Sequence, residues 1–100
     1  MKRIRVAGPA ERDLDDIWHR IATESGSIDI ANGVVDSITE AFALFARAPN
    51  AGTRRSEIEE GVRAFPVSKY IIYYRVAGPY VVISRVIHGM RDQWAAYHDE

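Results

Sequence analysis

The chain has 100 residues, 13 basic and 14 acidic side chains for a net charge of −1, and no cysteine. This length fits a single domain over residues 1–100, and the lack of cysteine excludes disulfides, thiol catalysis and thiolate metal sites. A pI of about 6.3 excludes a uniformly basic nucleic-acid binder. Because no signal peptide and no apolar run of about 18 residues is present, we expect a cytoplasmic protein that does not enter the membrane.

The first half of the chain predicts one strand and two helices. Residues 1–6 alternate apolar and basic side chains, as in a strand with one buried face. Apolar residues at helical spacing then predict a helix over about 9–24, with the acidic residues of its first turns on the solvated side. Ser27 is expected to cap a second helix, which Pro49 ends. Two amphipathic helices joined by a short turn predict an antiparallel hairpin that needs a sheet to cover its apolar stripes.

The second half predicts strands and a short tail. After a polar loop over 49–61, strand patterns run over 62–67, 69–76 and 80–87, and the turn at 77–79 makes the last two a hairpin. Pro66 cannot donate to a ladder, so its strand should lie at an edge or a bulge. The tail holds Trp94 and Tyr97, which suit a short helix on the sheet. The expected fold is α+β, a helical hairpin on a twisted, mainly antiparallel sheet in the order β-α-α-β-β-β with a short C-terminal tail.

The last strand carries a cation within an apolar row. Strict alternation places Val81, Ile83, Arg85 and Ile87 on one face of the sheet. Since an unpaired charge there would be costly, Arg85 should have an acidic partner in the fold or lie at an opening where a ligand supplies one.

Positive charge is concentrated in residues 61–91, which carry +5 and no acidic residue, whereas the rest of the chain carries −6. Such asymmetry indicates a polyanion or an acidic protein as partner of this half. If the strands are adjacent, six residues are expected to gather on the sheet surface that the helices leave open and to contact phosphates or carboxylates. They are Arg63, Lys69, Arg75, Arg85, His88 and Arg91.

His88 and the aromatic residues admit two interpretations each. Nearby cations would favour the neutral form of His88, which would suit acid-base work on an RNA 2′-hydroxyl; alternatively, its ring holds the turn at Gly89. A nuclease would need a second proton-transfer group, for which only Lys69, Tyr73 and Tyr74 are near in sequence. We expect Tyr70, Tyr74 and Trp18 to be core residues, whereas Trp94 either packs on the sheet or is an exposed anchor for a partner. The three histidines share no ligand spacing, so neither a metal site nor a cofactor is expected.

Five segments in order resemble the ParE branch of the RelE/ParE toxins of bacterial toxin-antitoxin systems. They are residues 10–17, Ala48-Pro49-x-x-Gly52, Gly61-Val62-Arg63, residues 70–75 and the ending Arg85-Val86-Ile87-His88-Gly89-Met90-Arg91-Asp92. The resemblance covers nearly the whole chain, and the ending is its most specific element.

The resemblance implies a non-enzymatic poison that binds DNA gyrase together with its DNA and stabilises the cleaved form. It also implies a ParD-like antitoxin that holds the toxin in a hetero-oligomer. Residues Arg63, Lys69, Arg75, Arg85, His88, Arg91 and Trp94 would contact the target or the antitoxin. An apolar groove along the helices beside the +5 strands would suit an acidic amphipathic antitoxin segment. The alternative is a RelE-like, ribosome-dependent messenger RNA endoribonuclease that uses Arg63, Arg85 and His88.

Overall fold

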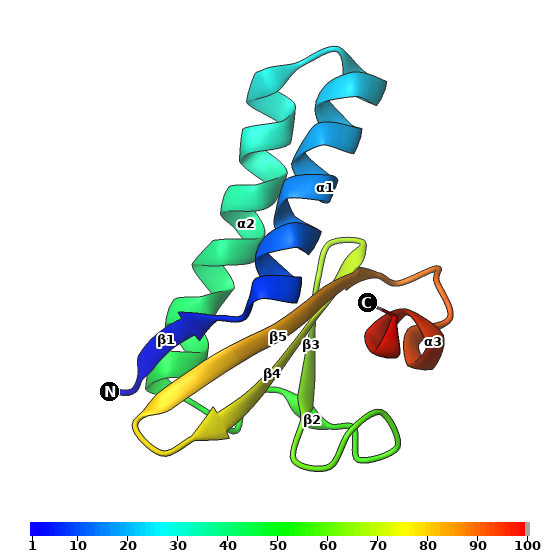
Figure 1. Cartoon of the computed structure of the whole chain (residues 1–100). Coiled ribbons are helices and arrows are strands. Elements are labelled where there is room, and N and C mark those ends of the chain that lie inside the picture. The colour runs from blue at the N-terminus through cyan, green and yellow to red at the C-terminus, as the bar shows by residue number, and fades with distance from the viewer. Residues whose placement is uncertain (100) are drawn as a thin grey trace.

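The computed structural model describes residues 1–99, so the last residue of the predicted domain lies outside the described residues. A pair of helices covers one face of a five-stranded sheet, and a third, short helix lies at the C-terminal end of the last strand (Figure 1). The elements are β1 (Arg3–Val6), α1 (Gly8–Ser25), α2 (Ile28–Arg47), β2 (Thr53–Arg54), β3 (Arg63–Val67), β4 (Tyr70–Ala77), β5 (Tyr80–His88) and α3 (Gln93–His98). The predicted α+β class and the helical hairpin on a mainly antiparallel sheet are confirmed.

The helical hairpin forms where the apolar periodicity indicated. Pro9 stands in the first turn of α1, and Gly26 closes the helix with a left-handed φ of 69°, which a glycine adopts without strain. The predicted cap of α2 is confirmed, because the Ser27 hydroxyl accepts a hydrogen bond from the backbone N–H of Ile30 at 3.1 Å. The loop between the two helices lies farthest from the sheet, so the distal half of the hairpin projects beyond it (Figure 1).

The sheet has the strand order β1-β5-β4-β3-β2, in which β1 pairs parallel to β5 and all other pairs are antiparallel. The two-residue strand β2, which falls within the predicted loop, pairs only with Arg63 and Ala64 of β3. Pro66 therefore lies where β3 has an open edge, as its missing N–H predicts.

The apolar residues form two clusters, one on each face of the sheet. The larger cluster, under the hairpin, includes Ile38, Phe45 and Tyr74. The rings of Phe45 and Tyr74 stack with their centroids 4.1 Å apart. The smaller, on the other face, holds Tyr73 together with Tyr97 of α3. Tyr70 and Tyr74 are core residues as predicted.

Trp18 departs from its predicted core position. It is half-buried, and its indole N–H donates to the Asn32 side chain at 2.7 Å, so it joins α1 to α2 at the rim of the core.

The strict alternation predicted for the last strand is wrong beyond Ile83. Tyr74 pairs with Ile83 and Tyr73 with Arg85, so Ser84 is an extra residue that forms a β-bulge. Ile83 and Val86 consequently share the face under the hairpin, whereas Arg85 and Ile87 turn to the face of α3. The extra residue keeps the guanidinium of Arg85 out of the main core.

Candidate functional site

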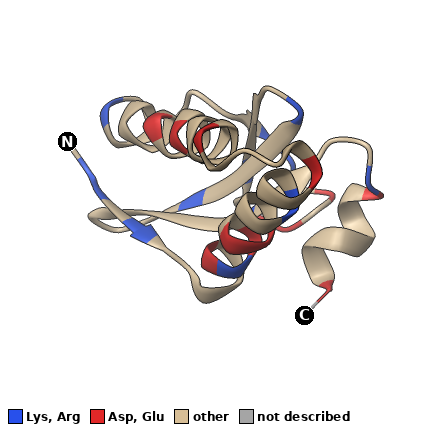
Figure 2. Cartoon of the chain, turned by 90° about the horizontal axis from the view of Figure 1, so that it is seen from above, with Lys and Arg blue, Asp and Glu red and all other residues tan. Residues whose placement is uncertain are grey.

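The charged residues are segregated between the layers of the fold. Every charged side chain in the five strands is an arginine, whereas the acidic residues gather on the helices and loops (Figure 2). The asymmetry along the sequence is therefore also an asymmetry in space. An arginine-bearing sheet under an acid-rich hairpin favours an anionic partner for the sheet side.

The structure does not bring the six predicted residues into one cluster. Arg63 begins β3 and lines a hollow beside β2, whereas Lys69 and His88 line another hollow at the far end of the same strand. Arg91 lies beside α1. Arg63 is the cross-strand partner of Tyr74 and shares its face of the sheet, so Arg75, the residue after Tyr74, lies on the opposite face. The cations are therefore spread over several separate parts of the surface rather than forming one binding site.

Arg85 has the acidic partner that its position requires. Its Nε and Nη2 atoms donate to the two carboxylate oxygens of Asp13 in α1 at 2.7 and 2.9 Å, and both side chains are nearly buried. Its Nη1 atom donates to the backbone carbonyls of Ala96, Tyr97 and Asp99 at the end of α3. The hydrogen bonds with Asp13 raise the pKa of Arg85 above its ordinary value, although burial acts in the opposite direction. This guanidinium is engaged within the fold.

Asp13 was expected on the solvated side of the first helix, and that expectation is wrong. It lies three residues after Ala10 and four before Ile17, both buried, so it shares their face of α1. Strand β1 pairs with β5 only as far as Ile83, and the Asp13 carboxylate accepts the N–H of Val86 beyond that point at 2.9 Å. The helical spacing was the signal that could have identified Asp13 as the partner of Arg85.

His88 holds the turn after β5. Its Nδ1 atom accepts the backbone N–H of Met90 at 3.1 Å, its carbonyl accepts from the Gln93 amide, and its ring meets the edge of Tyr70 at 5.3 Å. It also lines an open, mainly apolar hollow of about 520 Å³ together with Lys69 and Met90. Of the two interpretations of His88, the geometry favours the structural one.

The tyrosines considered as proton-transfer partners are buried and engaged. Tyr73 donates to the Gln93 side chain at 2.7 Å, and Tyr74 donates to the Pro49 carbonyl at 2.8 Å while accepting the N–H of Gly52 at 2.7 Å. Burial raises the pKa of both tyrosines, which makes them poorer proton donors. Among residues 1–99, no group of three His, Asp or Glu side chains could hold a metal ion.

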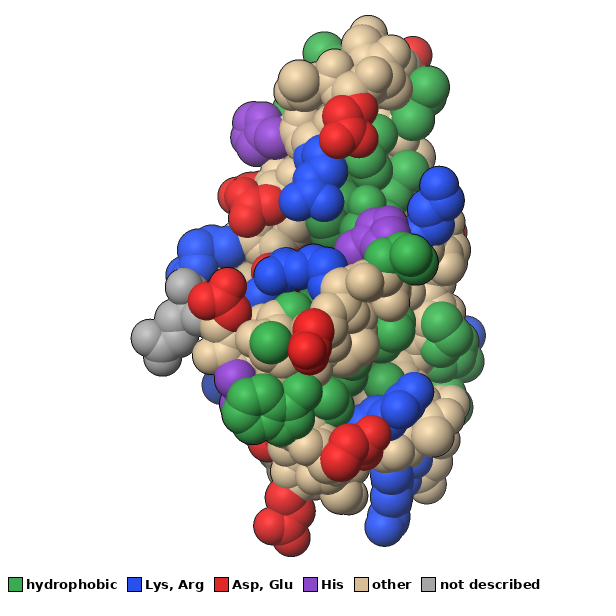
Figure 3. All heavy atoms as spheres, turned by 90° about the vertical axis from the view of Figure 1, so that its right-hand side faces the viewer, with side chains coloured by type: hydrophobic (Ala, Val, Ile, Leu, Met, Phe, Trp, Pro, Cys, Tyr) green, Lys and Arg blue, Asp and Glu red, His purple; other side chains and the backbone are tan. Residues whose placement is uncertain are grey.

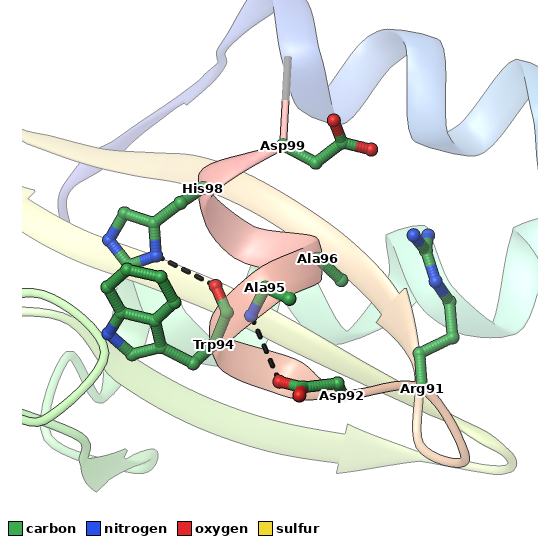
Figure 4. A pocket seen from close by; sticks show the side chains of 7 residues that line it. All are labelled: Arg91, Asp92, Trp94, Ala95, Ala96, His98 and Asp99. Carbon is green, nitrogen blue, oxygen red and sulfur yellow. Dashed lines mark hydrogen bonds between the residues drawn. The ribbon is translucent and has the colours of Figure 1, made fainter.

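Helix α3 divides its aromatic residues between the core and the surface. Tyr97 packs on the sheet with its hydroxyl within hydrogen-bond distance of Ser84 and Glu59, at 3.1 and 3.2 Å, whereas Trp94 is 57% exposed. The Trp94 indole stacks on the His98 ring at 4.1 Å beside a hollow that also includes Arg91 (Figure 4). Of the two positions considered for Trp94, the structure shows the exposed one.

Hydrophobic, basic and acidic side chains lie side by side on the face that carries this hollow (Figure 3). Met90 is 88% exposed next to the basic Arg91, and Trp94 lies beyond Asp92 in the first turn of α3. Large apolar side chains exposed among cations are typical of surfaces that bind another protein. None of the helices described within residues 1–99 is long and apolar enough to cross a membrane.

Comparisons with known proteins agree with this architecture. Residues 4–93 match the family model described as ParE toxin of type II toxin-antitoxin system, parDE. Toxin ParE3 of Caulobacter vibrioides is 29% identical over 89 residues, which cover 89% of this chain and 88% of the relative. Toxin ParE1 of the same organism is 28% identical over 88 residues, covering 88% of this chain and 90% of the relative.

Solved structures show the same fold. A chromosomal ParDE toxin-antitoxin system from P. aeruginosa superposes with a TM-score of 0.77 at 24% identity, covering 88% of this chain and 96% of that one. The toxin-antitoxin complex RelBE2 from Mycobacterium tuberculosis gives 0.55 at 26% identity, covering 87% and 96%. Because the family model spans most of the chain, this protein belongs to the ParE toxin family of type II toxin-antitoxin systems.

Proposed function

We propose that this toxin acts without enzymatic chemistry, by inhibiting DNA gyrase, stabilising its cleaved-DNA complex in the cytoplasm and thereby blocking replication. The observation that carries the proposal is the engagement of the groups a ribonuclease would need. Arg85 is bound to Asp13 and to the end of α3, His88 holds its own turn, and Tyr73 is buried. The engagement of these groups within the fold supports action through binding rather than through acid-base catalysis.

The proposed contact surface for gyrase is formed by Met90, Arg91 and Trp94. All three side chains are exposed. Arg91 and Trp94 line one hollow together with Asp92 and Asp99, and Met90, which precedes Arg91 in the chain, lines the hollow beside His88. An aromatic anchor beside an arginine is the composition of binding hot spots. Arg63, Lys69 and Arg75 remain candidates for additional contacts with the target or with its DNA.

We further propose that a ParD-like antitoxin neutralises the toxin by forming a hetero-oligomer with it. Support comes from the arginine-bearing strands and from the exposed apolar residues beside them, which suit an acidic amphipathic segment that folds on binding. The family description and the ParDE structure place relatives of this chain in such systems.

A gyrase supercoiling and cleavage assay tests the proposal. We expect the purified toxin to accumulate linear, cleaved DNA, and we expect the antitoxin encoded beside it to abolish this effect. Trp94→Ala should weaken the effect by about tenfold, in line with the loss of one hot-spot anchor. Ile28→Ala is a matched control, because Ile28 is similarly exposed at 61% but lies at the hairpin loop.

Indifference of gyrase at every toxin concentration would contradict the proposal. The alternative function, ribosome-dependent cleavage of messenger RNA, would then be tested with translating ribosomes. Cuts at fixed codon positions that disappear in His88→Ala would establish the ribonuclease and overturn the gyrase proposal.

A further inference from the structure

A polar hollow of about 380 Å³ lies beside β2 and the start of β3, away from Trp94. Its lining includes Asn50, Arg54, Ser56, Glu60, Arg63 and Val76. Two guanidinium groups, a hydroxyl and a side-chain amide thus surround one open space, while Val76 and part of the backbone complete the wall. The donors outnumber the single carboxylate.

The two arginines of the hollow lie beside each other, and neither forms an ion pair within residues 1–99. Arg54 and Arg63 are direct partners in the antiparallel pair of β2 and β3, so their side chains leave the same face of the sheet about 5 Å apart. Like charges in this arrangement repel each other and cost stability. Within residues 1–99, no carboxylate oxygen lies within 4.0 Å of either guanidinium, and Glu60 lines the hollow beyond that distance.

The Arg54–Arg63 pair differs from the arginines that have acidic partners. Arg55, the next residue in the chain, pairs with Glu57 at 3.3 Å, and Arg85 pairs with Asp13. Arg54 and Arg63 instead lie opposite each other in adjacent strands, so each has a like charge as its cross-strand partner. A bound anion would remove the repulsion and take the place of the missing carboxylate.

Arg63 is held in position for such a ligand. Its Nη1 atom donates to the Gly52 carbonyl at 2.7 Å, and the N–H of Gly52 donates to the buried Tyr74 hydroxyl. Gly52 cannot be replaced easily, since a Cβ there would come within 2.8 Å of the Tyr74 ring. One arm of the guanidinium is therefore fixed to the core, and its remaining donors are available to the hollow.

We propose that this hollow binds a phosphate group of a nucleic-acid backbone. Two guanidinium groups with a hydroxyl and an amide match the several oxygens of a tetrahedral phosphate better than the two oxygens of a single carboxylate. The open, polar wall leaves room for the sugar that continues from a phosphodiester. Single-stranded RNA and duplex DNA share this chemistry, and both are probes in the test. The inference deepens the proposed contact of Arg63 with the target or its DNA, and its test is independent of the gyrase assay because binding is measured without gyrase.

The experiment measures binding of inorganic phosphate by amide chemical shifts, and binding of a labelled single-stranded RNA and a labelled DNA duplex by fluorescence anisotropy. We expect saturable changes in the amide chemical shifts around Gly52 and Arg63 when phosphate is added. The dissociation constants for the nucleic acids should be about tenfold larger in Arg54→Gln and in Arg63→Gln. Loss of one phosphate contact should also reduce the salt dependence, lowering the slope of log K against log salt by about one. The RNA and DNA arms identify which backbone the hollow prefers.

Arg55→Gln is the matched control, because it removes the same charge from the same loop but from a side chain already paired with Glu57. Its affinity should change less than about twofold. Arg54→Gln keeps the test decisive if Arg63→Gln perturbs folding, since the Arg54 side chain makes no hydrogen bond within residues 1–99. An equal loss of affinity in all three variants would mean that only the total positive charge matters, and it would overturn the proposed phosphate site. Tighter binding of a poly-glutamate peptide than of either nucleic acid would overturn the phosphate assignment.

Discussion

Arg85 joins three parts of the chain through a single guanidinium group. It bridges β5, the first helix and the carbonyls at the end of α3, and only about 12% of its side chain is exposed. Removing one member of such a pair leaves the other charge buried without a partner, which costs more than the pair itself contributes. The residue that the sequence singles out as anomalous is therefore a structural centre of the fold.

Substitution of Arg85 by glutamine should lower the free energy of unfolding by about 3 kcal/mol, because Asp13 and three carbonyls lose their donor. Urea denaturation followed by circular dichroism measures this change. Arg55→Gln should cost less than about 1 kcal/mol, since the Arg55–Glu57 pair is exposed. Equal losses in the two variants would contradict the structural role of Arg85.

Buried tyrosines predict a loss of stability at alkaline pH. Burial raises the pKa of Tyr73, Tyr74 and Tyr97, so the folded protein retains these phenolic protons at pH values where the unfolded chain has released them. The contribution is fully present below about pH 10, the ordinary tyrosine pKa, and is lost as pH rises through the higher folded-state values.

The free energy of unfolding should therefore fall above about pH 10, by up to about 1.4 kcal/mol per pH unit for each tyrosine. Denaturation at a series of pH values, with tyrosinate absorbance recorded in parallel, measures the slope. Tyr73→Phe should reduce this slope, because it removes one titrating group. A slope unchanged by the substitution would show that other groups govern the alkaline loss.

At the scale of elements, periodicity predicted the helices and the main strands, because apolar spacing records which side of each segment is buried. It could not predict the bulge at Ser84, since one extra residue leaves the composition of the strand unchanged and appears only in the pairing with Tyr73 and Tyr74. The same limit applies to the sites. The arginines were visible in the sequence, but their distribution around the sheet depends on strand order and register. The opposition of Arg54 and Arg63 in particular required the two-residue strand β2.

Deletion of Ser84 should remove the bulge without reversing the two faces of β5, whereas Ser84→Ala should keep the bulge. After the deletion Arg85 directly follows Ile83, so alternation still places Arg85 and Ile87 on the face opposite Ile83 and Val86. Both variants lose the hydrogen bonds of the Ser84 hydroxyl with the Tyr73 carbonyl and the Tyr97 hydroxyl, at a cost of about 1–3 kcal/mol. Amide proton dispersion in NMR spectra should show both variants folded, and a collapsed spectrum of the deletion variant would contradict this account.

At the scale of the whole molecule, the first and last strands depend on each other. Strand β1 pairs in parallel with β5, so Arg3 lies beside Tyr80, 77 positions later in the chain. The Asp13–Arg85 pair spans a separation of 72 residues between the same two ends of the sequence. The hairpin therefore has no complete sheet to cover until β5 is in place.

A chain ending after Gly78 should accordingly be unfolded, whereas a chain ending after Asp92 should keep the sheet and lose only α3. Limited proteolysis and far-ultraviolet circular dichroism compare the two truncations with the full chain. The shorter one lacks β5, which lies between β1 and β4 and pairs with both. Protease resistance of this shorter chain would refute the mutual dependence of its ends.

The pairing of β1 with β5 also has a consequence for how the protein is made. Ribosomes add about 5–20 residues per second and release the N-terminus first, so β1 emerges long before the strand it pairs with. Contacts between such distant residues form late, because the chain between them has to close as one loop. A nascent chain thus cannot complete its sheet before β5 has been made, and a translation product that stops before β5 has no folded form. Termination of synthesis before β5 should therefore release inert fragments, and only a chain that includes this strand becomes a toxin that needs an antidote.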